Sequence, residues 1–126
     1  MRPLRAPEVT PETQPFWDAA TEGKLLIKRC GACGEPHYPP RALCPACLSP
    51  ETRWEEAAGT GAVYSLSTLR RGPDAPYTVA YVTLDEGPAV LTNLDGAPED
   101  FAIGTRVRVR FAPTDGGPPV PMFAPE

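Results

Sequence analysis

The chain has 126 residues, a length that fits one compact domain, or a small domain joined to a module held together by a metal ion. Its 18 prolines and 11 glycines argue against a helical protein and favour short strands joined by turns. The formal net charge is −4, and no stretch of 18 apolar residues is present, so we expect no membrane-spanning segment.

The first part of the chain, residues 1–29, is expected to form a lead-in, a short helix and a strand. Residues 1–12 are typical of an extended segment. The helix should begin with Thr13 as its N-cap, because a proline in the next positions is tolerated in a first turn. Gly23 should end it. Leu25 to Ile27 is expected to be a strand that leads toward the cysteines.

Residues 30–53 contain all four cysteines, in two Cys-x-x-Cys pairs. Cys30 and Cys33 form the first pair, and Cys44 and Cys47 form the second, with ten residues between them. Thiolates are preferred zinc ligands, and each pair supplies two, so the spacing predicts a rubredoxin-like zinc ribbon with one zinc ion. A catalytic zinc keeps a coordination position open, whereas four cysteines fill the shell. We therefore expect this zinc to be structural.

Two disulfides, or four buried free thiols, are the alternatives to a zinc site. Disulfides require an oxidising compartment. The segment from Met1 to Thr13 contains three prolines, two arginines and no apolar run, unlike a signal peptide, so we expect a cytoplasmic protein. His37 lies beside the predicted metal loop, but four thiolates leave it no coordination site. We expect it to lie on the surface or to pack in a hairpin.

Residues 54–126 show a pattern of strands and turns throughout. Five or six short antiparallel strands in about 70 residues predict a small Greek-key barrel, most simply an OB-fold. The fold class is therefore mainly β, with a short N-terminal helix, a zinc ribbon and a C-terminal OB-fold barrel. The expected barrel strands are residues 62–69, 77–84, 88–94, 105–111 and 120–123.

Two groups of arginines are candidates for binding an anionic ligand, including the phosphates of a nucleotide-like cofactor. Arg106, Arg108 and Arg110 alternate with apolar residues, which places the three guanidinium groups on one face of a strand. Guanidinium groups bind phosphate well, but the alternative is an ordinary solvated face of a barrel strand. Arg70 and Arg71 lie in a loop of glycine and proline, where binding residues are common.

No catalytic set can be assembled from these residues. The chain has one histidine, and every cysteine is assigned to metal, so neither a Ser/His/Asp nor a Cys/His arrangement is available. The neighbouring carboxylates Glu55 and Glu56 would point to opposite faces of a strand. No glycine-rich phosphate loop is present. We expect no catalysis by this chain alone.

Several segments occur in an order that resembles a known family, the zinc-ribbon plus OB-fold proteins long described as a domain of unknown function and associated with acyl-CoA and thiolase-like enzymes. The resemblance covers nearly the whole chain, although no short motif of the family marks a ligand site that transfers residue by residue. The segments that carry it are Pro15-Phe16-Trp17, Gly23-Lys24-Leu25, Cys30-Gly31-Ala32-Cys33-Gly34, Pro39-Pro40-Arg41, Cys44-Pro45-Ala46-Cys47, residues 59–65, residues 77–82, residues 84–87 and residues 104–107.

The resemblance implies an accessory subunit, or a fused domain, beside a thiolase-superfamily enzyme. Family partners include thiolases, hydroxymethylglutaryl-CoA synthase, lipid-transfer-protein-like aldolases that act on steroid-CoA thioesters, and MaoC-like enoyl-CoA hydratases. We therefore expect a non-catalytic subunit of an acyl-CoA-processing complex in lipid or steroid degradation, with acyl-CoA at a site shared with the partner. Phe16 and Trp17 are candidate docking residues, because aromatic anchors are enriched at interfaces. Their alternative role is packing onto the ribbon or barrel.

A nucleic-acid-binding module is the competing hypothesis, because zinc ribbons and OB-folds both occur in such proteins. Single-strand binders combine a basic groove with stacking aromatic residues. Residues 54–126 carry five arginines against ten carboxylates, a formal charge of −5, which repels a polyanion. We assign the tyrosines of this region to core packing, and so expect no nucleic-acid partner.

Overall fold

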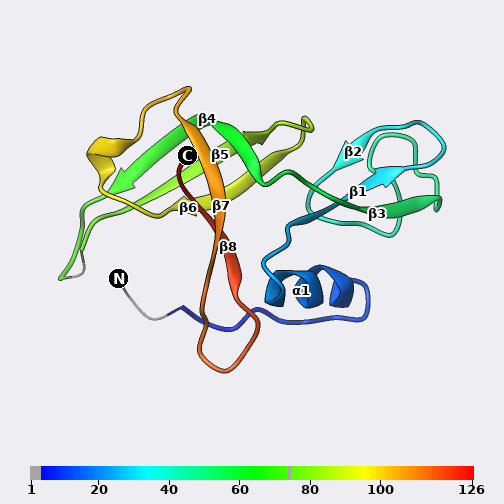
Figure 1. Ribbon diagram of the computed structural model, residues 1–126, viewed down its shortest axis with the longest axis horizontal. Helices are drawn as coiled ribbons and strands as arrows, with labels where there is room; N and C mark the ends of the chain where they lie inside the picture. Colours follow the sequence, from blue (N-terminus) through cyan, green and yellow to red (C-terminus); the bar gives the residue numbers. More distant parts are fainter. Residues whose placement is uncertain (1–3, 74) are drawn as a thin grey trace.

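The computed structural model describes residues 4–73 and 75–126. Figure 1 shows a small sheet at one end of the molecule, a barrel at the other, and helix α1 below the sheet. The fold is mainly β, as the sequence predicts. In the described part of the chain, no helix is both long enough and apolar enough to cross a membrane.

Helix α1 spans Gln14–Thr21 and begins where the sequence predicts. Thr13 occupies the N-cap position, but its side chain makes no capping hydrogen bond; its Oγ1 donates instead to the Thr10 carbonyl, 3.3 Å away. The helix ends before Gly23, whose φ of +78° suits glycine and whose N–H donates to the Ala20 carbonyl. Phe16 lies on the buried face and is 3% exposed.

The ribbon sheet has three antiparallel strands in the order β2-β1-β3: β1 is Leu26–Cys30, β2 is Pro36–His37 and β3 is Thr52–Glu56. The sequence predicts β1, although the strand continues to the first cysteine, and it does not predict β2 or β3. Strand β3 pairs with β1 and crosses the expected division between residues 53 and 54.

Contacts between side chains help to hold β3 against β1. The Arg29 guanidinium donates two hydrogen bonds of 3.0 Å to the Glu55 carboxylate, an arrangement that lowers the pKa of Glu55. Lys28 is buried, and its Nζ lies 4.7 Å from the centre of the Trp54 ring, a cation–π contact. The short β3, which has no apolar alternation of its own, is thus fixed by polar pairs.

The barrel is closed and has five strands in the order β4-β5-β6-β8-β7. Every expected barrel strand is confirmed, with each end within two residues of its predicted place. The expectation of purely antiparallel pairing is wrong at one seam, because β6 and β8 meet in parallel at Leu94 and Phe123. The barrel elements are β4 Thr60–Leu69, β5 Tyr77–Leu84, β6 Ala89–Leu94, the 3₁₀ helix η1 Pro98–Asp100, β7 Arg106–Ala112 and β8 Val120–Pro125.

One continuous apolar core joins the helix, the ribbon strand β1 and the barrel. Inward-facing positions of the barrel strands alternate with outward-facing ones, as expected for period-2 strands. Because Phe16, Leu25 and Ile27 pack in the same cluster as the barrel interior, the ribbon is attached through buried surface as well as through the chain. The barrel members of this cluster are Ala57, Val63, Ala80, Val82, Leu84, Val90, Leu94, Phe101, Val107 and Phe123.

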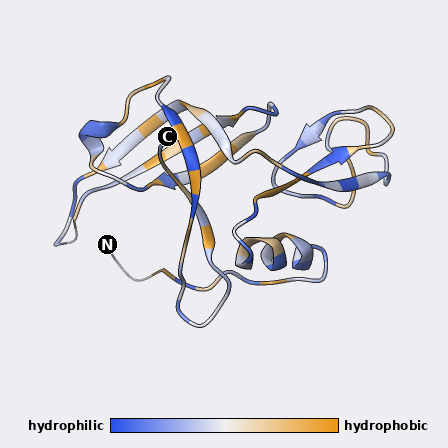
Figure 2. Cartoon of the chain, viewed as in Figure 1, coloured by the Kyte–Doolittle hydropathy of each residue, from blue (hydrophilic) through white to orange (hydrophobic). Residues whose placement is uncertain are grey.

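Core packing does not account for two of the barrel tyrosines, so that expectation is wrong for them. Tyr64 is 69% exposed and Tyr81 is 47% exposed. The register of β4 against β5 shifts between Val63 and Ser65, so Tyr64 is the extra residue of a β-bulge. Figure 2 shows hydrophilic and hydrophobic colour alternating along β7.

Gly61 sits where the barrel closes, opposite Leu84 of β5 and Val107 of β7. A Cβ added there would lie 2.4 Å from the Thr83 carbonyl oxygen, which is a backbone atom that cannot rotate away. Gly61→Ala is therefore expected to lower the free energy of unfolding by about 1–3 kcal/mol, the usual cost of overpacking. Chemical denaturation of the two zinc-loaded chains checks this; equal midpoints would contradict it.

Candidate metal centre

The two Cys-x-x-Cys pairs form knuckles of matching geometry. In the first, the N–H of Ala32 donates to Cys30 Sγ at 3.3 Å; in the second, the N–H of Ala46 donates to Cys44 Sγ at 3.3 Å. Each knuckle also closes with a backbone bond to its first cysteine, from Gly34 at 2.9 Å and from the residue after Cys47 at 2.8 Å. The cysteine spacing thus produces the same turn twice.

The four sulfur atoms converge on one point. The ligand atoms of Cys30, Cys33, Cys44 and Cys47 all lie within 4.8 Å of one another. The cross-knuckle distances are 3.6 Å from Cys30 to Cys47 and 3.7 Å from Cys33 to Cys44. Four thiolates about 2.3 Å from a tetrahedral zinc lie about 3.8 Å apart, so the sulfur atoms fit one zinc ion. They are also too far apart for disulfides, in which sulfur atoms lie about 2.05 Å apart.

The backbone around Cys30 favours its thiolate. Its sulfur accepts N–H groups from Cys33 and Ala32, and these bonds, with help from the neighbouring Cys47 thiol, lower the pKa of Cys30 to about 6. A thiolate is the form that binds metal. Cys30 and Cys44 are buried, whereas Cys33 and Cys47 are exposed, so the centre lies at the surface with one ligand of each knuckle facing water.

Leu48, beside the second cysteine pair, has an unusual backbone conformation. It has a φ of +65°, a left-handed conformation that favours glycine, and its side chain is 72% exposed. The equivalent position in the first knuckle is Gly34, whose φ is +82°. A strained, exposed leucine thus stands where the other knuckle has the residue that the turn prefers. Sequence reasoning missed this, although aligning the two knuckles would have revealed it.

His37 is not part of the metal centre and packs inside the ribbon. It is 6% exposed, and burial lowers its pKa, so the ring is neutral at pH 7. Its Nε2 accepts the N–H of Arg41 at 3.3 Å, which leaves the proton on Nδ1, a buried atom with no hydrogen-bond partner among the described residues. The expected hairpin-packing role describes it well.

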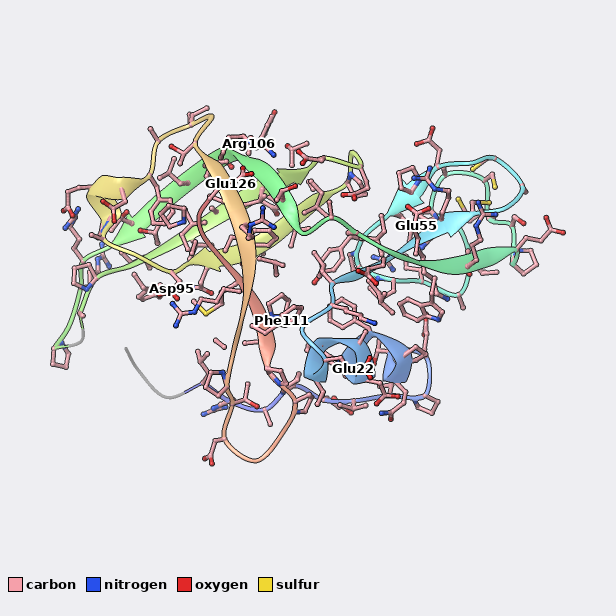
Figure 3. All side chains as sticks on the ribbon, in the orientation of Figure 1. Glu22, Glu55, Asp95, Arg106, Phe111 and Glu126 are labelled. Carbon is pink, nitrogen blue, oxygen red and sulfur yellow. The ribbon has the colours of Figure 1, made fainter. Side chains whose placement is uncertain are left out.

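The arginine row of β7 lies on the outer face of the barrel and pairs with carboxylates. Arg106 donates to both oxygens of Asp85, at 2.8 and 2.9 Å, and to Glu126 at 3.1 Å, and Arg110 donates to Asp95 at 2.7 Å. Figure 3 shows Arg106 beside Glu126. The hydrogen bonds from Arg106, and then that from the Thr60 hydroxyl, lower the pKa of Asp85 to about 2.

These arginine–carboxylate pairs affect the prediction that the arginines bind phosphate. Arg108 also approaches Glu126, at 3.8 Å, so all three arginines have a carboxylate neighbour. Their guanidinium groups already stabilise the outer face of the barrel, and a phosphate would compete with those carboxylates. Arg70 and Arg71 are exposed in the loop after β4. For both groups, phosphate binding stays a prediction.

The two candidate docking aromatics have different surroundings. Phe16 is buried, with its ring centre 4.8 Å from that of Trp17 in an edge-to-face contact and 5.9 Å from that of Tyr38. Trp17 is partly buried against the core. The packing alternative therefore describes Phe16, which has almost no surface to offer a partner, and docking through Trp17 stays a prediction.

Comparison with known proteins places the chain in a family. Residues 17–53 match the model of the ChsH2 rubredoxin-like zinc ribbon domain, and residues 54–112 match that of the ChsH2 C-terminal OB-fold domain. The chain belongs to the ChsH2 (DUF35) family. This confirms the family that the sequence resembles, the zinc-ribbon and OB-fold class, and zinc as the metal.

Three curated relatives carry different names. A probable enoyl-CoA hydratase alpha subunit of Thermomonospora curvata is 40% identical over 87% of this chain, which spans 36% of that relative. A DUF35 domain-containing scaffold protein of Methanocaldococcus jannaschii is 36% identical, over 69% of this chain and 67% of its own length. The benzoylsuccinyl-CoA thiolase subunit BbsA of Thauera aromatica is 27% identical, over 86% and 79%. The chain thus spans about a third of the hydratase subunit but most of the other two.

A solved structure gives a close match in three dimensions. It is a chain of the Ltp2-ChsH2(DUF35) aldolase, which is 37% identical in sequence with a TM-score of 0.82. The match covers 94% of this chain and 98% of that chain. The helix, ribbon and barrel therefore recur together in a chain described as part of an aldolase.

Removal of the metal is expected to unfold the ribbon, because three short strands offer little core of their own. Structural zinc contributes about 10–16 kcal/mol of apparent binding free energy in zinc-finger peptides. Metal analysis should find one zinc per chain. After chelation, hydrogen exchange should show loss of protection in β1 to β3, with β4 to β8 still protected. A metal-free chain with a protected ribbon would contradict the role of zinc.

Leu48→Gly is expected to stabilise the zinc-loaded chain by about 0.5 kcal/mol. The left-handed conformation costs an ordinary residue roughly 1–2 kcal/mol, and the extra freedom of glycine in the unfolded chain offsets about 0.5–1 kcal/mol of that gain. The matched control is Gly34→Ala, where a Cβ meets nothing within 4 Å and only the conformation is unfavourable, so stability should fall. Thermal unfolding of both variants measures this; a lower midpoint for Leu48→Gly would contradict the strain.

Proposed function

We propose that this chain is a non-catalytic, zinc-stabilised accessory subunit or domain of an acyl-CoA-processing complex. It docks on a thiolase-superfamily enzyme, either a thiolase or a lipid-transfer-protein-like aldolase, and stabilises or completes that enzyme. The partner carries the catalysis, and acyl-CoA binds at a site that the two chains share. In this proposal the ribbon follows residues 1–29 and the barrel follows the ribbon, with their division at residues 53 and 54 moved to the end of strand β3.

The match to the DUF35 chain of an aldolase is the observation that carries the proposal. That likeness extends over 94% of this chain at 37% identity, so it spans the helix, the ribbon and the barrel. The name of BbsA, a thiolase subunit, and the name of the archaeal scaffold protein support the same class of role. The hydratase alpha subunit is longer than this chain, and its name supports a MaoC-like hydratase as a further partner.

The chemistry of the described residues supports a role without catalysis. The four thiols fit a closed zinc shell, so the metal has no open position for a substrate or a water. The one histidine is buried in the ribbon, with its Nε2 engaged by Arg41. Asp85 pairs with Arg106, which keeps it ionised and occupied. A general base with access to a substrate is missing from this set.

Co-expression with thiolase-superfamily enzymes of the same genome tests the proposal. With one of them, the chain should co-elute in size-exclusion chromatography, and the enzyme should be more soluble or more active on its acyl-CoA thioester than it is alone. The metal-free Cys30→Ser/Cys33→Ser variant is the control, and it should fail to give that gain. Partners that stay soluble and equally active without the chain, or thioester turnover by the zinc-loaded chain alone, would contradict the proposal.

A further inference from the structure

Three neighbouring barrel strands contain no charged residue. Strands β4, β5 and β6 read TGAVYSLSTL, YTVAYVTL and AVLTNL, without one Asp, Glu, Lys or Arg. Strand β7, on the other side of β4, carries three arginines on its outer face. A solvated barrel face usually carries charge, as β7 does, whereas depletion of charge is typical of the centre of a protein interface.

The strand register gathers exposed apolar side chains on this uncharged face. Tyr81 of β5 lies opposite Leu91 of β6 on one side and Ser65 of β4 on the other. Leu91 is 59% exposed, and the bulge in β4 adds Tyr64, at 69%. We call the outer surface of β4, β5 and β6, centred on Tyr64, Tyr81 and Leu91, the tyrosine face.

The neighbouring positions extend the tyrosine face without adding charge. Val79 pairs with Ser67 on β4 and with Asn93 on β6, and Thr83 pairs with Ala89. The small polar residues around the exposed tyrosines are hydrated in the free chain. Because they are uncharged, removing water from them on binding costs little free energy. Buried charges are costly at an interface, and this face has none to bury.

We propose that the tyrosine face is the surface through which this chain docks on its thiolase-superfamily partner. The inference rests on the proposed function and names its contact surface. Tyr64, Tyr81 and Leu91 provide the anchors, since tyrosine is enriched among the residues that dominate binding energy. The matching surface of the enzyme is charge-poor at its centre and neutral or basic at its rim.

Charge favours an enzyme subunit over a second copy of this chain as the occupant. Residues 57–126, which follow strand β3, carry five arginines against eight carboxylates, a formal charge of −3, so two barrels brought face to face would repel each other. A nucleic acid is disfavoured for the same reason, and because stacking aromatics need basic neighbours that β4 to β6 lack. An enzyme surface with a neutral or basic rim meets no such repulsion.

The alternative docking surface lies beside the second Cys-x-x-Cys pair. Leu43 and Leu48 are 52% and 72% exposed there, and a shallow groove between them is also lined by Glu12 and Arg41. Unlike the tyrosine face, this groove includes ionic side chains of both signs. In Figure 1 the ribbon that bears it and the barrel strands lie at opposite ends of the molecule, so separate substitutions distinguish the two surfaces.

The test uses the zinc-loaded full chain and the enzyme with which it co-elutes. Leu91→Lys and Tyr81→Lys each place a charge at the centre of the tyrosine face, and each should weaken binding about 100-fold in calorimetry. Leu43→Lys, a matched change at a leucine of similar exposure, should alter the dissociation constant less than about 3-fold. Zinc content and thermal midpoint verify that each variant is folded.

A second measurement needs no variant. Hydroxyl-radical footprinting of the wild-type complex should show Tyr64, Tyr81 and Leu91 protected relative to the free chain. The inference would be overturned if the wild-type chain binds the enzyme, Leu91→Lys binds with the same affinity, and these three residues show no protection. It would also be overturned if Leu43→Lys were the only variant to lose binding. Self-association, or binding of a dT oligonucleotide, that is lost with Tyr64→Ala would overturn it too. A wild-type chain that binds no enzyme would instead contradict the proposed function.

Discussion

The convergence of four thiols is the constraint on which the rest of the ribbon depends. Strand β2 has only two residues, and β3 is held to β1 by their antiparallel pairing, the Arg29–Glu55 pair and the contact of Lys28 with Trp54. Such a small sheet buries too little apolar surface to fold without a stabilising cross-link. The bound metal provides this cross-link, and Leu25 and Ile27 connect the folded ribbon to the core of the barrel.

A closed metal shell agrees with the accessory role that we propose for the chain. A zinc ion with four thiolates neither polarises a substrate nor activates water. The barrel, for its part, divides its outer surface in two: β7 presents arginines paired with Asp85, Asp95 and Glu126, while β4 to β6 present tyrosine, leucine and small polar residues. In our proposal, the charged part of the surface stays in water and the uncharged part contacts the partner enzyme.

Local patterns in the sequence predicted most of the fold, and long-range pairing explains what they missed. The cysteine spacing specified the knuckles, and β-rich runs bounded by turn residues specified β4 to β8, because both signals are contained within a few residues. Strands β2 and β3 exist only through pairing with β1, and residues 52–56, Thr-Arg-Trp-Glu-Glu, show no alternation. The exposure of Tyr64 depends on a bulge that is visible only once β4 is set against β5. Likewise, the carboxylate partners of the arginine row come from other strands.

The coordination of zinc in the working complex tests the central claim most directly. X-ray absorption at the zinc edge should show four sulfur ligands at about 2.3 Å, both in the chain with its partner and after an acyl-CoA thioester is added. An unchanged spectrum during turnover is the predicted result. A nitrogen or oxygen ligand, or a change in coordination when substrate arrives, would show that the metal takes part in the chemistry and would contradict the account.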